Sequence, residues 1–168
     1  TRDQIMTILK IDSSITGEAS VSRQLTKAVL DQLQAQRPGT QVVTRDLAAE
    51  PLDHFTLASF GDTAVVDEFL AADTVVIGAP MYNFGIPSQL KAWIDRITIA
   101  GKTFRYTPEG RPEGLAGDKR VIAAIPRGGL HEPDRGLDHV ATHSRGALCF
   151  PGMPPHSCHT GVLPGVPR

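Results

Sequence analysis

One stretch of the chain, residues 74–96, constrains the fold more than any other. It begins with Thr-Val-Val-Ile-Gly at residues 74–78, an apolar and mostly β-branched run that is typical of a parallel strand buried on both faces. The run ends at Ala79-Pro80, because proline cannot donate a hydrogen bond to a strand ladder. From Pro87 the apolar residues recur every three or four positions, as on one face of a helix. The stretch therefore predicts a strand, a loop and a helix, with the loop at the sheet edge where open α/β folds bind ligands.

The same alternation of apolar strands and amphipathic helices continues along the chain. Strands are predicted at residues 5–11, 40–47, 74–78 and 119–125, and helices at 20–36, 62–72 and from 87 onward. The second strand keeps several polar residues, which indicates a place near the sheet edge. This order calls for a parallel sheet with helices on both faces. Right-handed crossovers then restrict the fold to Rossmann-like or flavodoxin-like strand orders.

Length and charge exclude several classes of protein. With 168 residues the chain is expected to form one domain. Its 17 basic and 18 acidic residues leave a net charge of -1, so we predict no nucleic-acid partner. No apolar run reaches the roughly 18 residues typical of a membrane span, and the first residues lack a signal-peptide pattern. We therefore expect a cytoplasmic protein without a membrane partner.

The loop after the first strand is rich in hydroxyl groups. It carries Ser13, Ser14, Thr16, Ser20 and Ser22 just before and within the start of a predicted helix. A helix N-terminus offers unpaired N–H groups and a partial positive charge, so these hydroxyls can complete a phosphate site. The alternative is that Ser20 serves only as the helix N-cap. No dinucleotide fingerprint and no P-loop motif is present.

Two further loops follow predicted strands. Met-Tyr-Asn-Phe at residues 81–84 offers aromatic and amide groups, and Arg127-Gly128-Gly129 offers bare backbone that can lie against a flat ligand. The paired glycines are equally consistent with an ordinary turn. Together with the hydroxyl-rich loop, these segments fit a phosphorylated planar ring such as FMN.

Seven segments carry a resemblance to a known family. They are Ile11-Asp12-Ser13-Ser14-Ile15, Ser20-Val21-Ser22-Arg23-Gln24-Leu25, Ala79-Pro80-Met81-Tyr82-Asn83-Phe84, Pro87-Ser88-Gln89-Leu90-Lys91, Thr103-Phe104-Arg105-Tyr106, Pro112-Glu113-Gly114-Leu115 and Arg127-Gly128-Gly129. In these segments the chain resembles the FMN-dependent NADH:azoreductase and NAD(P)H:quinone oxidoreductase family. The resemblance covers residues 6–139, which we expect to form a flavodoxin-like FMN-binding domain.

The resemblance implies a homodimer with one FMN per protomer. Carried over position by position, it implies that the phosphate is held by Ser14, Ser20, Val21 and Ser22, and that the isoalloxazine is lined by Met81, Tyr82, Asn83 and Phe84. It also implies that the polar edge of the ring is contacted by Pro126 (a serine in the family), Arg127, Gly128 and Gly129. Tyr106 is expected to reach the substrate face of the partner protomer's flavin.

The resemblance also implies an enzymatic activity. FMN would take a hydride from NADH or NADPH and reduce a quinone or an azo compound in a second, ping-pong step. We expect no side-chain nucleophile, because the flavin carries the chemistry. His131 either donates a proton or steers the substrate, or it is simply a residue at the rim. A flavodoxin-like electron carrier is a weaker alternative, because the segment 103–106 is of the azoreductase type.

The tail, residues 140–168, is expected to be atypical. Its many prolines and glycines exclude a long helix, and we expect the sheet to lack an intact fifth strand and last helix, through a reading-frame change or a truncation. The strand at 119–125 would then be an exposed apolar edge. The alternative to an active enzyme is therefore a domain that binds FMN with little or no turnover. The tail also contains His143, Cys149, His156, Cys158 and His159. Their spacing matches no standard zinc site, and we predict no metal.

Overall fold

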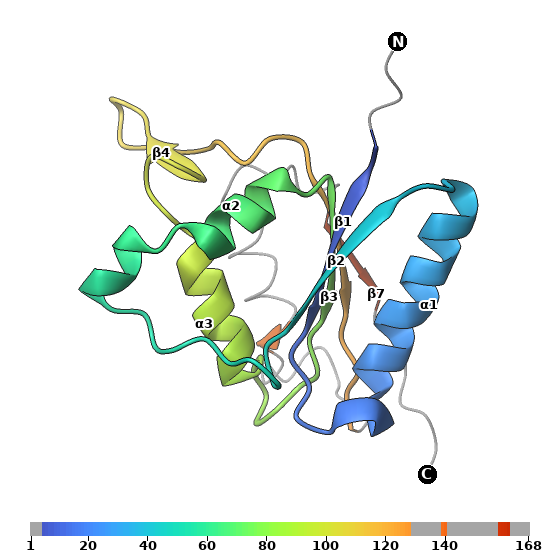
Figure 1. Cartoon of the computed structure of the whole chain (residues 1–168). Coiled ribbons are helices and arrows are strands. Elements are labelled where there is room, and N and C mark those ends of the chain that lie inside the picture. The colour runs from blue at the N-terminus through green and yellow to red at the C-terminus, as the bar shows by residue number, and fades with distance from the viewer. Residues whose placement is uncertain (1–4, 129–138, 141–157, 162–168) are drawn as a thin grey trace.

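The computed structural model describes residues 5–128, 139–140 and 158–161. Strands and helices alternate along the chain, apart from one antiparallel hairpin (Figure 1). The strands are β1 (Thr7–Asp12), β2 (Gln41–Asp46), β3 (Thr74–Gly78), β4 (Phe104–Tyr106), β5 (Pro112–Gly114), β6 (Arg120–Ala124) and β7 (Cys158–Gly161). The α-helices are α1 (Val21–Gln36), α2 (Ala64–Ala71) and α3 (Ser88–Ile97), with short 3-10 helices at Gly17–Ala19 and Leu57–Gly61.

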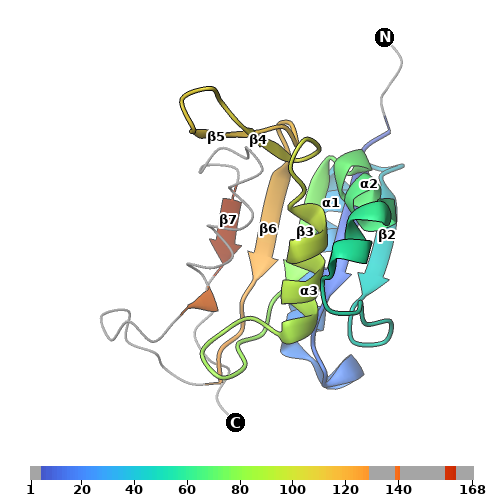
Figure 2. The same cartoon turned by 90° about the vertical axis from the view of Figure 1, so that its left-hand side faces the viewer.

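Five strands form one parallel sheet in the order β2-β1-β3-β6-β7. In its register, Ile8 of β1 lies opposite Val42 of β2 and Thr74 of β3. Helix α1 covers one face, whereas α2 and α3 cover the other (Figures 1 and 2). This is the flavodoxin-like strand order. The predicted parallel sheet with helices on both faces is confirmed, and so is the edge position of the second strand.

One expectation about the sheet is wrong. Cys158–Gly161 forms a fifth strand, β7, which pairs in parallel with β6 and places Cys158 opposite Val121. The prolines at 155 and 164 flank this strand and do not interrupt it, so the ladder is possible despite the proline-rich composition. The outer edge of β6 is therefore paired. The expected loss of the last helix concerns residues 141–157 and 162–168, which lie outside the described residues.

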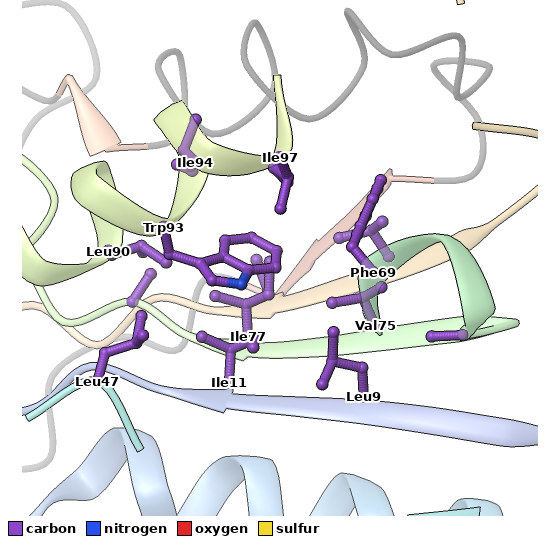
Figure 3. Close-up of a cluster of buried hydrophobic side chains, with 14 of the residues drawn as sticks. Leu9, Ile11, Leu47, Phe69, Val75, Ile77, Leu90, Trp93, Ile94 and Ile97 are labelled. Atoms are coloured by element: carbon purple, nitrogen blue, oxygen red, sulfur yellow. The ribbon is translucent and has the colours of Figure 1, made fainter. Parts of the chain in front are cut away.

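The core has two layers, one on each face of the sheet. All five residues of β3 are buried, as the uninterrupted apolar run predicts. Odd-numbered residues of β1 and β3 pack with α2 and α3, where Phe69 and Trp93 meet edge to face at 6.0 Å (Figure 3). On the other face, Ile8 and Val76 pack against α1. Both layers hold the sheet rigidly beneath its carboxyl edge.

The β4–β5 hairpin lies apart from the main sheet. Its strands pair in antiparallel fashion, with Arg105 opposite Glu113. It stands near the end of the sheet where β1 begins, opposite the loops that follow β1 and β3 (Figures 1 and 2). Within the described part of the chain, no helix has the length and apolar character needed to cross a membrane.

Candidate functional site

Three loops meet at the carboxyl edge of the sheet, because they follow the neighbouring strands β1, β3 and β6. We name them the serine loop (residues 13–20), the aromatic loop (residues 79–87) and the arginine loop (residues 125–128). The Ser13 hydroxyl donates to the Gly78 carbonyl at 2.6 Å, and the Met81 N–H donates to the Pro126 carbonyl at 3.2 Å. The first bond joins the end of β3 to the serine loop, and the second joins the aromatic loop to the arginine loop.

The serine loop ends in the N-cap of α1. The Ser20 hydroxyl accepts from the Arg23 N–H at 3.3 Å, which confirms Ser20 as a cap. Its oxygen also lies 2.9 Å from the Ser22 hydroxyl. Ser14, Ser20 and Ser22 are almost fully buried, whereas Val21 is exposed. Capping and phosphate binding are compatible, because the cap satisfies only one N–H of the first turn.

The aromatic loop rests on the serine loop through Tyr82. The Tyr82 hydroxyl lies 3.2 Å from the Ser14 hydroxyl and accepts from the Ile15 N–H at 3.2 Å. The Ser14 hydroxyl also lies 3.0 Å from that of Thr16. The structure therefore brings together two groups of residues that the sequence assigns to one cofactor.

Asn83 and Phe84 occupy a strained two-residue turn. The N–H and carbonyl groups of Tyr82 and Gly85 bond to each other at 3.0 Å in both directions. Both central residues have positive φ, 48° for Asn83 and 65° for Phe84. Asparagine tolerates this region, but phenylalanine there is a genuine outlier. The turn holds the Phe84 ring 46% exposed, and strain of this kind clusters at ligand sites.

The arginine loop is only partly described. Pro126 has no N–H to donate, and its carbonyl is bound by Met81, so this residue supports the aromatic loop. Arg127 is half-buried and Gly128 is exposed at the same edge. The predicted contacts of Gly129 and His131 lie outside the described residues.

Tyr106 is not part of this group of residues. It lies in β4, at the opposite end of the sheet from the three loops (Figure 2), and is 62% exposed. An edge-to-face contact with Phe104 at 5.7 Å holds its ring.

Sequence reasoning did not single out a charged cluster beneath the serine loop. Arg23 forms a two-pronged ion pair with Asp46, at 2.7 and 2.9 Å. The hydrogen bond between them raises the pKa of Arg23 and lowers the pKa of Asp46, although partial burial opposes both shifts. Asp12, which is 2% exposed, pairs with Lys10 at 2.7 Å. The sequence offers one signal for the cluster, an arginine three residues after the N-cap.

An open groove of about 450 Å³ lies beside the aromatic loop. It runs between α3 and the segment that follows β2, and His54, Phe55, Ile86, Lys91 and His139 contribute to its lining. The groove is wide enough for a small planar molecule next to the strained turn. The residues that the structure describes contain no group of three or more His, Cys, Asp and Glu side chains able to hold a metal ion.

The donor set fits FMN. The buried hydroxyls of Ser20 and Ser22 at the N-terminus of a 16-residue helix, with the buried Ser14 hydroxyl at the other end of the serine loop, suit a phosphate group. Gly78 faces this helix, because a Cβ built there would be in van der Waals contact with Ser22, at 3.4 Å. The exposed Phe84 ring and the Tyr82 ring offer aromatic surface to a flat ligand a short distance along the same edge.

Comparison with known proteins gives a consistent result. A family model described as "Flavodoxin-like fold" matches residues 6–160. The chain is 50% identical to the FMN-dependent NADH:quinone oxidoreductase of Rhizobium meliloti (strain 1021), over 88% of this chain and 81% of that protein. Among solved structures it is similar to an azoreductase from Bacillus anthracis str. Sterne, with a TM-score of 0.82, 29% identity and coverage of 93% and 85% of the two chains. The azoreductase AzrA superposes with a TM-score of 0.81 at 31% identity, with 95% and 87% covered.

Proposed function

The chain belongs to the flavodoxin-like fold family and, within it, to the FMN-dependent NADH:quinone oxidoreductases, and we propose that it passes electrons from NADH through FMN to quinones and aromatic azo compounds. The observation that carries this proposal is the junction of the serine loop with the aromatic loop, through Ser14 and Tyr82. It supports the proposal because it brings the loop that leads into the N-terminus of α1 next to an aromatic surface at one edge of the sheet.

Each loop has a separate task in this proposal. Ser14, Ser20 and Ser22, with the N–H groups near Val21, hold the phosphate. Met81 to Phe84 would lie against the isoalloxazine and keep water from one side of it. Pro126, Arg127 and Gly128 would contact its polar edge, and the predicted contact of Gly129 stays a prediction. The groove at His54 and Ile86 gives the acceptor a place beside the ring.

The protein positions reactants, and the bound cofactor supplies the redox chemistry. FMN, when bound, accepts a hydride from a nicotinamide and gives up electrons to a quinone or azo group. The residues of this chain would orient the ring through the Tyr82–Gly85 turn and would hold the phosphate at the N-terminus of α1. No described residue is required as a nucleophile. NADH is the proposed donor, and NADPH is tested beside it.

We also propose that the enzyme works as a homodimer in the cytoplasm. Support for the dimer comes from Tyr106, whose ring is exposed at the end of the sheet away from its own three loops (Figure 1). If Tyr106 contributes to a flavin site, that site belongs to another copy of the chain. The cytoplasm is where NADH is plentiful.

A second candidate function, FMN binding with little or no turnover, is not favoured. It depended on the absence of a fifth strand, and β7 is present. The likeness to curated oxidoreductases also extends over 88% of the chain. The division of the chain at residue 139 stays a prediction.

The test of the proposed function is optical. Purified protein, reconstituted with FMN, should be yellow and should bleach when NADH is added without oxygen. Colour should return when a quinone or an azo dye is added. The double variant Ser20→Ala/Ser22→Ala should lose the colour, whereas Lys27→Gln, farther along the same helix, should keep it. Protein that takes up no FMN would contradict the proposal, and yellow protein that never bleaches would leave binding alone.

The dimer is tested by mixing two inactive variants. Tyr106→Ser keeps its own phosphate site, and Ser20→Ala/Ser22→Ala keeps Tyr106. If Tyr106 acts on the partner's flavin, a mixed dimer holds one complete site, and mixing the two variants should restore activity. Failure of the mixture, with dimers present in solution, would contradict this arrangement.

A further inference from the structure

We propose that Arg23 is a positioning residue, which with Asp46 fixes both ends of the serine loop and thereby makes the site select phosphorylated flavin over unphosphorylated flavin. The inference rests on the proposed function, since it assumes that FMN is the ligand. In this inference Arg23 holds the loop in position, whereas the serine hydroxyls of the proposed function contact the phosphate.

Arg23 contacts both ends of the serine loop. Its backbone N–H donates to the Ser20 hydroxyl at 3.3 Å, at the end of the loop that enters α1. Its side-chain Nη2 donates to the Ser14 carbonyl at 3.4 Å, at the end that leaves β1. One residue therefore holds the Ser14 backbone at one end of the loop and the Ser20 hydroxyl at the other.

Asp46 holds the guanidinium of Arg23 in place. The two side chains meet as a fork, with Nη1 2.7 Å from Oδ2 and Nη2 2.9 Å from Oδ1. Asp46 is itself fixed, because its Oδ1 accepts from the N–H groups of Ala48 and Ala49 at 3.0 and 3.1 Å. The loop is thus anchored to the end of β2, which pairs with β1 in the sheet. Fork geometry of this kind is specific to arginine.

The cluster works through geometry more than through charge. Arg23 faces Asp46 and, at 3.6 Å, Asp12, while Lys10 pairs with Asp12 at 2.7 Å. The positive charges of Arg23 and Lys10 are therefore balanced by Asp46 and Asp12, and Glu18 adds a further negative charge near Arg23. The Arg23 side chain is only 14% exposed. Its Nη1 and Nη2 are engaged by these partners, whereas its Nε has no hydrogen-bond partner among the described residues. A phosphate above the loop meets N–H and hydroxyl donors, which Arg23 keeps in position.

The test compares two ligands on matched variants. Arg23→Lys, Arg23→Gln and Asp46→Asn remove the fork in three ways. Lys27→Gln and Asp31→Asn are the controls, because these residues form an exposed ion pair at 2.7 Å on the same helix. The dissociation constants of FMN and of riboflavin are measured for each protein by quenching of flavin fluorescence, and folding is checked by circular dichroism.

We expect the FMN dissociation constant to rise about tenfold or more in all three fork variants, the effect of losing one charge-assisted hydrogen bond. The riboflavin constant should stay within about twofold, because riboflavin has no phosphate for the loop to hold. Both controls should match wild type. If Arg23→Gln fails to fold, Arg23→Lys and Asp46→Asn carry the comparison.

Three results overturn the inference. If Arg23→Lys binds FMN as tightly as the wild-type protein does, a positive charge at position 23 is sufficient and the fork geometry is not needed. Equal loss of FMN and riboflavin shows a general loss of structure, and unchanged FMN affinity in every fork variant shows that the fork has no role. If the wild-type protein itself does not prefer FMN to riboflavin, the proposed function is contradicted as well. A failure of the proposed function is therefore visible in the wild-type protein, whereas a failure of this inference is visible only in the fork variants.

Discussion

The Tyr82 hydroxyl lies 3.2 Å from the Ser14 hydroxyl, at the point where the loops after β1 and β3 meet. The two residues are far apart in sequence, and the parallel pairing of β1 with β3 brings their loops to the same edge. This contact fixes the aromatic loop relative to the serine loop. The phosphate-binding part and the ring-binding part of the site are therefore mechanically linked.

The Ser14–Tyr82 contact should appear as a measurable coupling. A double-mutant cycle with Ser14→Ala and Tyr82→Phe should give a coupling in the free energy of unfolding of about 0.5–1.5 kcal/mol, the usual net value of one hydrogen bond. Urea unfolding without FMN measures it. With saturating FMN the coupling should shrink, because a phosphate would share the Ser14 hydroxyl. A coupling of zero without FMN would show that the contact contributes nothing.

Replacing Phe84 by glycine should stabilise the protein and weaken cofactor binding. Phe84 has a φ of 65°, which costs a side-chain-bearing residue about 1–2 kcal/mol, and glycine removes that cost. The variant also lacks the exposed ring that we assign to the flavin. We expect a gain of about 1 kcal/mol by urea unfolding, with weaker FMN affinity. Asn83→Gly is the control, and its gain should be smaller because asparagine tolerates this region.

Replacing Trp93 by phenylalanine should change the free energy of unfolding only slightly, although the residue is large and buried. The indole is fully buried (Figure 3), and its N–H has no hydrogen-bond partner among the described residues. The substitution removes this unpaired donor, worth about 1–3 kcal/mol, which offsets the apolar surface that is lost. We expect a net change within about 1 kcal/mol in urea. Phe69→Leu, with no such offset, should cost more. A loss of more than about 3 kcal/mol in Trp93→Phe would show that the N–H is satisfied in solution.

Lys119 closes the end of α2. Its ammonium group donates to the Leu70 carbonyl at 2.7 Å and to the Ala72 carbonyl. Lys119→Met leaves both acceptors without this donor, so we expect a loss of about 1–3 kcal/mol. Lys102→Met, which replaces a lysine whose ion pair with Asp67 is more exposed, should cost less. Urea unfolding near neutral pH gives both values.

The pH dependence of this loss has a defined sign. Burial lowers the pKa of Lys119, although Asp73 partly opposes the shift. Between that lowered pKa and the unfolded value of about 10.4, the unfolded chain binds a proton that the folded chain does not. Wild-type stability therefore gains relative to Lys119→Met as pH rises through this window. A difference that narrows toward pH 10 would contradict this assignment.

Local patterns were enough to predict most of the fold. The β3–α3 segment shows this best. The apolar run around Val76 predicts a buried strand, and the helical spacing around Trp93 predicts a helix, and both patterns depend only on residues that are close in the sequence. β7 escaped prediction for a physical reason. Its residues, Cys-His-Thr-Gly, form no apolar run, and it is defined by backbone pairing with β6, far away in the sequence.

In the candidate site, too, some features could be predicted from local sequence and others could not. Ser20 as an N-cap follows from local chemistry, and the structure places it there. The turn at Phe84 could not be predicted, because an L-residue disfavours positive φ and only the surrounding structure holds it there. The Arg23–Asp46 fork joins a helix to the end of a strand, and no spacing rule connects such positions.

The position of β7 in the sheet has a consequence for synthesis. β6 is complete once residue 124 has been made, but its outer neighbour is not made until residues 158–161. At roughly 5–20 residues per second, the nascent chain leaves that edge of β6 open for a few seconds. The time needed to make the residues between the two strands therefore sets the shortest delay before β6 can acquire its outer partner.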